Sequence, residues 1–194
     1  VYAIAYEGSG SDGFLRTVEV ESQAVILPTV TTDNATLVEE ESASINGLIT
    51  DGGGEACQYQ FEYDIDSGAP YTYNTGWTGN LTTGQHFSAS ITGLDKGTKY
   101  YFRAQARNSS GTSNGSELSF LTRPDPPPTF SASAVSDTQI DLTWTKGEGA
   151  QRTMVRRKTG DYPADRDDGH LVYFDTGTTV SDTGLTPATT YYYK

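Results

Sequence analysis

Short stretches in which apolar and polar residues alternate follow one another along the chain, and this period of two predicts β-strands. Two of the clearest are KYYFRAQARN at residues 99–108 and QIDLTWT at residues 139–145, in which apolar or small side chains recur at every second position. Such strands bury one face and leave the other in water. No long stretch places apolar residues at the spacing of a helix, so the pattern predicts an all-β chain.

A repeated segment divides the chain into two parts. ITGLDKGTKYYFRAQARN begins at Ile91 and DTGLTPATTYYYK begins at Asp182; both read Thr-Gly-Leu, then a turn, then Thr-x-Tyr-Tyr. Between them lies RPDPPP at residues 123–128, and consecutive prolines favour an extended spacer that cannot donate ladder hydrogen bonds. We therefore expect two β domains, at residues 27–123 and 124–194.

The second domain resembles the fibronectin type III family in two places. Trp144 stands in a strand where that family carries a tryptophan, and residues 183–191 (TGLTPATTY) resemble the family's approach to a tyrosine corner. The resemblance implies an immunoglobulin-like β-sandwich in which the hydroxyl of Tyr191 bonds back to the backbone upstream. Tyr100 occupies the matching position of the first domain.

The first domain resembles the same family in a divergent form. It carries Lys96 where a proline is usual before the corner, and Gly47 stands near the position of the family's tryptophan. The expected architecture is therefore all-β: tandem immunoglobulin-like (fibronectin type III) β-sandwiches with an N-terminal β-hairpin segment.

The two ends of the chain carry strands without a complete domain. Residues 1–26 contain VYAIAY and GFLRTVEVE, which we interpret as the terminal strands of a preceding β domain or as an assembly segment. The second sandwich reaches its sixth strand at residues 191–194, and a missing last strand would leave an open edge. Two explanations stay open: the natural chain is longer, or a neighbouring subunit donates the strand and so builds a filament.

The acidic composition argues against several classes of partner. A formal net charge of −12 and an isoelectric point near 4.4 oppose nucleic-acid binding, which needs lysine and arginine to neutralise phosphates, and oppose anionic membranes. No stretch approaches about eighteen apolar residues, so direct membrane insertion is not expected. The single cysteine, Cys57, can form no intrachain disulfide; we interpret it as a small buried side chain, with a reactive thiol as the alternative.

The tripeptide Asp-Thr-Gly, which presents the catalytic carboxylates of aspartic proteases, occurs at Asp175 and at Asp182. A protease of that class needs two facing lobes that bring the carboxylates together to share one proton. Two copies seven residues apart along one hairpin do not provide them, so we interpret both as turns. His86 and His170 lie in different domains without paired-ligand spacing, so we expect no catalytic residue, no metal site and no cofactor.

The acidic loop GDYPADRDDGH at residues 160–170 raises the question of calcium. Asp161, Asp165, Asp167 and Asp168 offer oxygen ligands, but the loop lacks the D-x-D-x-D-G spacing that wraps one ion. A solvated loop and a calcium loop both stay open.

Two surface features suggest binding or modification. Tyr71, Tyr73 and Trp77 lie in a Gly- and Thr-rich segment, and exposed rings of this kind stack on sugars. Alternatively, Tyr71 and Tyr73 share one face of a strand and cover the core. These three are the candidate carbohydrate-binding residues. The candidate glycosylation sites are the Asn-x-Ser/Thr sequons at Asn34, Asn80, Asn108 and Asn114.

The sequence favours a non-catalytic extracellular module with a structural, adhesive or spacer role in a larger surface or secreted protein. Two alternatives remain. One is a subunit of an extracellular filament or virion appendage assembled by strand exchange, and the other is a carbohydrate-binding accessory region of a secreted polysaccharide-degrading enzyme. The expected partners are other protein modules, identical subunits or glycans.

Overall fold

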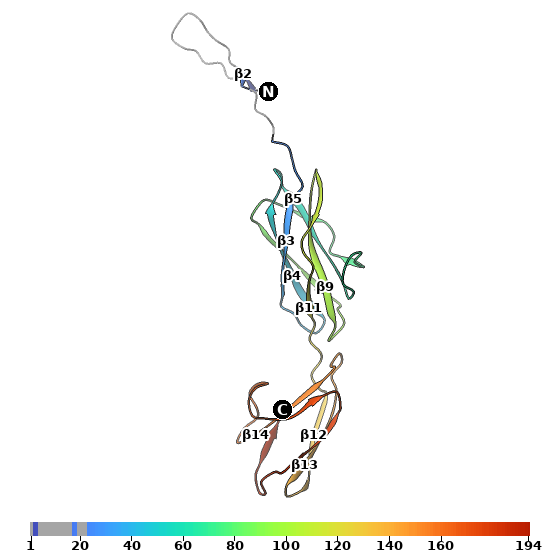
Figure 1. Cartoon of the computed structure of the whole chain (residues 1–194), viewed down its shortest axis with the longest axis vertical. Helices are drawn as coiled ribbons and strands as arrows, with labels where there is room; N and C mark the ends of the chain where they lie inside the picture. Colours follow the sequence, from blue (N-terminus) through green and yellow to red (C-terminus); the bar gives the residue numbers. More distant parts are fainter. Residues whose placement is uncertain (1, 4–16, 19–22) are drawn as a thin grey trace, which may run out of the picture.

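The computed structural model describes residues 2–3, 17–18 and 23–194, and every regular element in them is a β-strand. All strand pairs are antiparallel, which confirms the expected all-β class. Two larger units, joined by residues 122–128, lie end to end in Figure 1. Within the described residues, no strand of one unit pairs with a strand of the other.

The first unit contains a three-stranded sheet, ordered β3-β4-β8, and a larger sheet. In the larger sheet β9 pairs with β5, β10 and β11, and β5 also pairs with β6 and β7. The strands are β3 (Thr29–Thr36), β4 (Ser42–Asp51), β5 (Cys57–Asp64), β6 (Tyr73–Asn74), β7 (Thr78–Leu81), β8 (His86–Thr92), β9 (Lys99–Asn108), β10 (Gly111–Asn114) and β11 (Leu118–Leu121).

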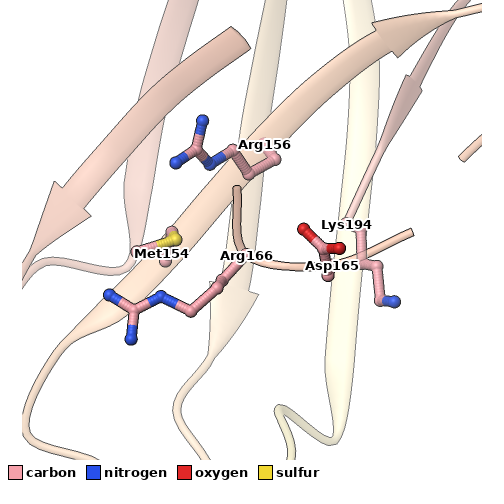
Figure 2. A pocket seen from close by; sticks show the side chains of 5 residues that line it. All are labelled: Met154, Arg156, Asp165, Arg166 and Lys194. Carbon is pink, nitrogen blue, oxygen red and sulfur yellow. The ribbon is translucent and has the colours of Figure 1, made fainter. Parts of the chain in front are cut away.

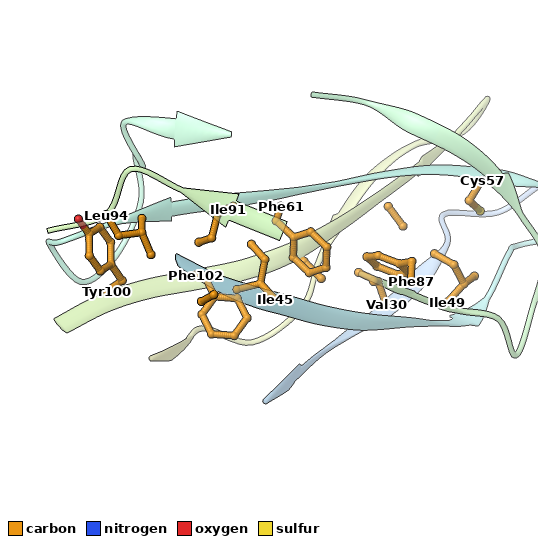
Figure 3. Packing of buried hydrophobic residues seen from close by; sticks show 13 residues of the cluster. Val30, Ile45, Ile49, Cys57, Phe61, Phe87, Ile91, Leu94, Tyr100 and Phe102 are labelled. Atoms are coloured by element: carbon orange, nitrogen blue, oxygen red, sulfur yellow. The ribbon is translucent and has the colours of Figure 1, made fainter. Parts of the chain in front are cut away.

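The apolar core of the first unit lies between its two sheets, as Figure 3 shows. Ile45 and Ile49 of β4 share one cluster with Phe61 of β5 and Phe102 of β9, and all four side chains are fully buried. Burial of each such side chain contributes roughly 1.5–3 kcal/mol. The alternation predicted for β9 is confirmed, since its apolar positions are buried in this core.

The packing of Phe87 accounts for the glycine at position 47. Gly47 is an inward position of β4 and pairs with Phe87 of β8. A Cβ atom on Gly47 would lie 2.7 Å from the Phe87 ring and 3.0 Å from the carbonyl oxygen of Thr31. The Phe87 ring, with its centroid 5.1 Å from that of Phe61, therefore fills the space that a larger residue at position 47 would need.

The second unit contains two three-stranded sheets, ordered β12-β13-β16 and β15-β14-β17. Leu142 and Trp144 of β13 are buried with Val155 of β14. The Trp144 indole N–H donates a hydrogen bond to Thr153 Oγ1 at 3.0 Å, which satisfies this polar group inside the core. The strands are β12 (Thr129–Ser136), β13 (Gln139–Thr145), β14 (Thr153–Thr159), β15 (His170–Asp175), β16 (Thr179–Thr183) and β17 (Tyr191–Tyr193).

Strand β12 is exposed along its whole length. Phe130 and Ala132 lie directly opposite the buried Trp144 and Leu142, so they occupy the inward face of their sheet. Phe130 is nevertheless 42% exposed, with its ring centroid 6.3 Å from that of Trp144. The described residues therefore leave the inward face of β12 uncovered.

At the amino end, β1 (Tyr2–Ala3) pairs with β2 (Thr17–Val18). These strands fall within the two segments that we expected in residues 1–26, and the rest of that prediction lies outside the described residues. In the part of the chain that the structure describes, no helix has the length and apolar character needed to cross a membrane.

The two units touch through the turn that carries Lys96. The Lys96 ammonium lies 2.8 Å from the carboxylate of Asp125 in the connecting segment and 3.3 Å from that of Glu148 in the second unit. A Cβ atom on Gly97 would lie 2.1 Å from the carbonyl oxygen of Gly149. The Asp125 N–H also donates to the Glu148 carbonyl oxygen at 2.9 Å. We call these five residues the joint.

Candidate functional site

The outward face of the larger sheet in the first unit carries a regular set of polar side chains. Residues of β5 and β9 that lie directly opposite each other point to the same face and contact across the strands. Because alternate residues of both strands are buried in the core, the residues between them face outward. We call this outward set the outer-face ladder, and its pairs are Gln58–Arg107, Gln60–Gln105 and Glu62–Arg103.

Each arginine of the outer-face ladder donates two hydrogen bonds to one oxygen of its partner. Arg107 donates from Nε and Nη2 to Gln58 Oε1 at 2.9 and 2.7 Å. Arg103 donates from the same two nitrogens to Glu62 Oε2 at 3.0 and 2.8 Å. Paired bonds of this kind fix the plane of a guanidinium group, so both arginines are held against the sheet.

Two glutamine side chains form the middle of the outer-face ladder and are buried although they face outward. Gln60 is 8% exposed and Gln105 is 7% exposed. Gln60 Nε2 donates to Gln105 Oε1 at 2.6 Å, and Gln105 Nε2 donates to Asn114 Oδ1 of β10 at 2.7 Å. The side-chain oxygen of Gln60, Oε1, and the second N–H on Gln105 Nε2 take no part in these bonds. The centre of the ladder therefore keeps one acceptor, Gln60 Oε1, and one N–H donor on each glutamine beyond its own network.

Trp77 lies at one end of the outer-face ladder. Thr78 of β7 lies opposite Tyr59, whose side chain packs on the core, so the preceding Trp77 falls on the outward face. The guanidinium carbon of Arg107 is 4.4 Å from the centroid of the half-buried Trp77 ring. This stacked contact holds the indole beside the sheet.

Tyr71 lies at the other end, where the guanidinium carbon of Arg103 is 5.1 Å from the ring centroid. The Tyr71 hydroxyl donates to Glu117, which also accepts from the Ser67 hydroxyl and the Gly68 N–H, each at 2.6 Å. The Ser67 hydroxyl, with the two other donors, holds the pKa of Glu117 below its ordinary value. Burial, together with the bond to Glu117, raises the pKa of Tyr71. The loop before β6 is thereby tied to the outward face.

Tyr73 lies on the opposite side of the sheet from Tyr71. It pairs with Tyr63, which packs against the core, and the two rings are stacked with centroids 5.4 Å apart. The expectation that Tyr71 and Tyr73 share one face of a strand is therefore wrong, because β6 begins only at Tyr73 and the chain turns before it. Of the three candidate rings, the structure brings Tyr71 and Trp77 to the outer-face ladder and leaves Tyr73 apart.

Both candidate tyrosine corners contain a hydroxyl-to-backbone bond. The Tyr100 hydroxyl accepts from the Asp95 N–H at 2.9 Å, and the Tyr191 hydroxyl accepts from the Thr186 N–H at 3.0 Å. Tyr100 is buried, whereas Tyr191 is half-buried. These are the upstream bonds that the family resemblance implied.

The two Asp-Thr-Gly motifs lie in different sheets, so the single hairpin that we expected does not form. Asp175 ends β15, is exposed, and accepts a hydrogen bond from the Thr176 N–H. Asp182 lies within β16 and is buried. Its carboxylate pairs with Arg157 at 2.7 Å and accepts from the Tyr193 hydroxyl at 2.9 Å. The two carboxylates thus share no partner.

Lys158, which precedes the acidic loop at residues 160–170, pairs with two aspartates of that loop. The Lys158 ammonium lies 2.9 Å from the Asp161 carboxylate and 3.1 Å from that of Asp168. The Ala164 N–H and this ammonium lower the pKa of Asp168. Within the described residues, no group of three or more histidine, cysteine, aspartate or glutamate side chains is arranged to hold a metal ion.

A cavity of about 240 Å³ opens beside this loop in the second unit (Figure 2). Arg156 Nε is buried without a hydrogen-bond partner in the described residues. Asp165 of the acidic loop is the one candidate residue among those that line the cavity. Its lining consists of Met154, Arg156, Asp165, Arg166 and Lys194.

Cys57 and the histidines occupy ordinary structural positions. The Cys57 side chain is fully buried, with its Sγ 3.4 Å from the Gly52 carbonyl oxygen, and burial raises the pKa of its thiol. This agrees with a small buried side chain. His86 and His170 are both exposed.

The four sequons differ in how their side chains are used. Asn34, Asn80 and Asn114 are exposed residues. Asn108 is half-buried, and its Nδ2 donates to two backbone carbonyl oxygens at 2.6 and 3.0 Å. Asn114 Oδ1 accepts the bond from Gln105 in the outer-face ladder.

Comparison with known proteins finds no matching family model. Chitinase 63 of Streptomyces plicatus is 32% identical over 124 residues, and Chitinase C of Streptomyces lividans is 31% identical over 124 residues. Each match covers 62% of this chain and 18% of the chitinase. The chain is therefore similar to one part of two chitinases and spans less than a fifth of their length.

The chain also has a partial likeness to a solved structure. The sensor domain of the anti-sigma factor RsgI4 from Pseudobacteroides cellulosolvens superimposes with a TM-score of 0.43 and 21% sequence identity. The superposition covers 52% of this chain and 98% of that domain.

Proposed function

We propose that this chain is a non-catalytic accessory region of an extracellular polysaccharide-degrading enzyme, built of two fibronectin type III-like sandwiches. The observation that carries the proposal is the sequence match to two chitinases. Because the match covers 18% of each chitinase, it concerns a part of those proteins that a catalytic region can accompany. An accessory region acts through binding and placement, and its fold alone does not define its role.

The joint favours a spacer role within this accessory region. Its ion pairs, backbone hydrogen bond and glycine contact connect the two units more closely than a flexible linker does. A stiff spacer keeps a catalytic region at a set distance from the other modules of the enzyme, which raises their effective concentration at one substrate. The structural role and the accessory role are thus compatible.

The complete open reading frame of the natural gene tests this proposal. We expect it to encode a glycoside hydrolase domain in the same chain as the two units. A complete frame that encodes further β modules and no hydrolase would contradict the proposal and favour a stalk or adhesive protein.

A deletion experiment on the full enzyme gives a second test. Removal of residues 27–194 is expected to slow the hydrolysis of insoluble polysaccharide and to leave the hydrolysis of soluble oligosaccharides unchanged. Loss of both activities in a folded deletion variant would show that these residues belong to the catalytic machinery.

A further inference from the structure

We propose that the outer-face ladder, with Trp77 and Tyr71 at its ends, binds a neutral polysaccharide whose sugars carry acetamido groups. This inference rests on the proposed function, which places the chain in a polysaccharide-degrading enzyme. It goes further by assigning the binding face and the chemistry of the sugar.

The charges on this face favour a neutral ligand. Arg103 is paired with Glu62, and Arg107 and Glu117 supply one further charge of each sign. The charges of these four side chains cancel, so the face neither attracts nor repels an ion strongly. Its recognition groups are amides, hydroxyls and rings, which suit an uncharged sugar chain.

The centre of the ladder complements an acetamido group. Such a group has one N–H and one carbonyl oxygen. The side-chain oxygen Oε1 of Gln60 offers an acceptor, and the second N–H on Gln105 Nε2 offers a donor, beyond the bonds of the ladder. Both glutamines are already shielded from water and held by neighbouring side chains, so binding would cost little further desolvation or ordering.

The positions of the rings indicate an extended ligand. Trp77 stacks on Arg107 and Tyr71 stacks on Arg103, and these arginines are four residues apart on β9. At about 3.4 Å per residue, the two stacked pairs are separated by roughly 14 Å along the strand, which exceeds one sugar ring. A guanidinium covers one face of each ring, so the sugar would contact the other face or the edge. The site therefore fits several linked sugars that follow β9.

Retention on insoluble chitin and on cellulose tests the proposal, because only chitin carries acetamido groups. We expect the wild-type chain to be retained more strongly on chitin. Trp77→Ala and Gln105→Leu should each weaken retention by about tenfold, the effect of losing one good contact. Tyr73→Ala is the matched control, since this ring comes from the same segment and lies on the opposite side of the sheet; its retention should equal that of the wild type.

Thermal unfolding of each variant and an NMR titration of the wild-type chain with soluble chitin oligosaccharides accompany this assay. The Trp77 indole and the side-chain amides of Gln60 and Gln105 should shift on titration, a readout that needs no substitution. Absence of chitin binding, equal retention on cellulose, or loss of retention in Tyr73→Ala but not in Trp77→Ala would each overturn the inference. Such a failure leaves the proposed function standing, because that proposal is judged by the open reading frame.

Discussion

Tyr100 and Tyr191 accept the same kind of backbone hydrogen bond in different surroundings, and this difference predicts unequal effects of substitution. Tyr100→Phe removes the acceptor from a buried position, where the Asp95 N–H would lose its partner at a cost of about 1–3 kcal/mol. Around the half-buried Tyr191, water can replace the lost bond, so Tyr191→Phe should cost less. Thermal unfolding of each unit measures both losses, and a larger loss for Tyr191→Phe would contradict this ordering.

The use of the Asn108 amide predicts which sequons accept a glycan. Asn34 and Asn80 are exposed, whereas Asn108 Nδ2 already donates two hydrogen bonds. After expression in a glycosylating secretory host, we expect peptide mass spectrometry to find glycan on Asn34 and Asn80 and an unmodified Asn108. A glycosylated Nδ2 keeps only one N–H, so full occupancy of Asn108 would show that folding does not need both hydrogen bonds.

At the residue scale, the sequence shows where this chain departs from the pattern of the family that it resembles, but not why. Gly47 is explained by Phe87, and Lys96 is explained by Asp125 and Glu148. Each partner lies at least 29 positions away along the chain. Contacts between distant segments depend on strand pairing, and alternation within one strand does not specify that pairing.

At the scale of strands and loops, alternation again predicts the faces of a strand but not its pairing with other strands. The alternation of β9 predicts which of its residues are buried and which face outward. It therefore predicts three of the six members of the outer-face ladder, Arg103, Gln105 and Arg107. The opposite placement of Tyr71 and Tyr73 depends on where β6 begins and on its pairing with β5. A two-residue strand after a long loop has too little pattern to reveal either.

The loop that carries Tyr71 predicts a pH dependence of stability. The pKa of Glu117 is lowered in the folded state by the Ser67 hydroxyl and the other donors. Its interactions therefore stabilise the first unit at pH values above the ordinary glutamate pKa of about 4.3, and they are lost as the pH falls through the folded value. Glu117→Gln should lower the melting temperature near pH 7 and reduce its acid dependence.

Comparison with a second variant isolates this effect. The pKa of Asp64 is also lowered, by hydrogen bonds from Thr72, so the wild-type chain has further acid dependence of the same sign. The measured quantity is thus the difference between wild type and Glu117→Gln across pH 3–7, with Glu41→Gln, at an exposed residue, as the control. An identical pH profile for wild type and Glu117→Gln would show that the Glu117 bonds do not stabilise the loop.

At the scale of the whole molecule, the joint determines whether the two units act as one rod or as two independent modules. The Lys96–Asp125 pair is partly buried, whereas the Glu148 carboxylate is 76% exposed. Ion pairs that water can reach contribute little, so the bonds of Lys96 alone would not hold the units. Gly97 and Gly149 allow their backbones to approach more closely than any side chain would permit. The stiffness of the spacer should therefore depend on these glycines more than on the charges, and it should change little with salt.

Gly97→Ala tests this dependence, because its Cβ atom would lie 2.1 Å from the Gly149 carbonyl oxygen. Gly97 also has a positive φ of 58°, which strains alanine regardless of contacts. Gly93→Ala is the matched control, since Gly93 has a φ of 73° and no heavy atom of another segment within 4 Å of the added Cβ. In small-angle X-ray scattering, we expect Gly97→Ala to broaden the range of arrangements between the units, while Gly93→Ala matches the wild type. If Gly97→Ala also gave the wild-type scattering curve, close contact at the joint would not be what fixes the spacer.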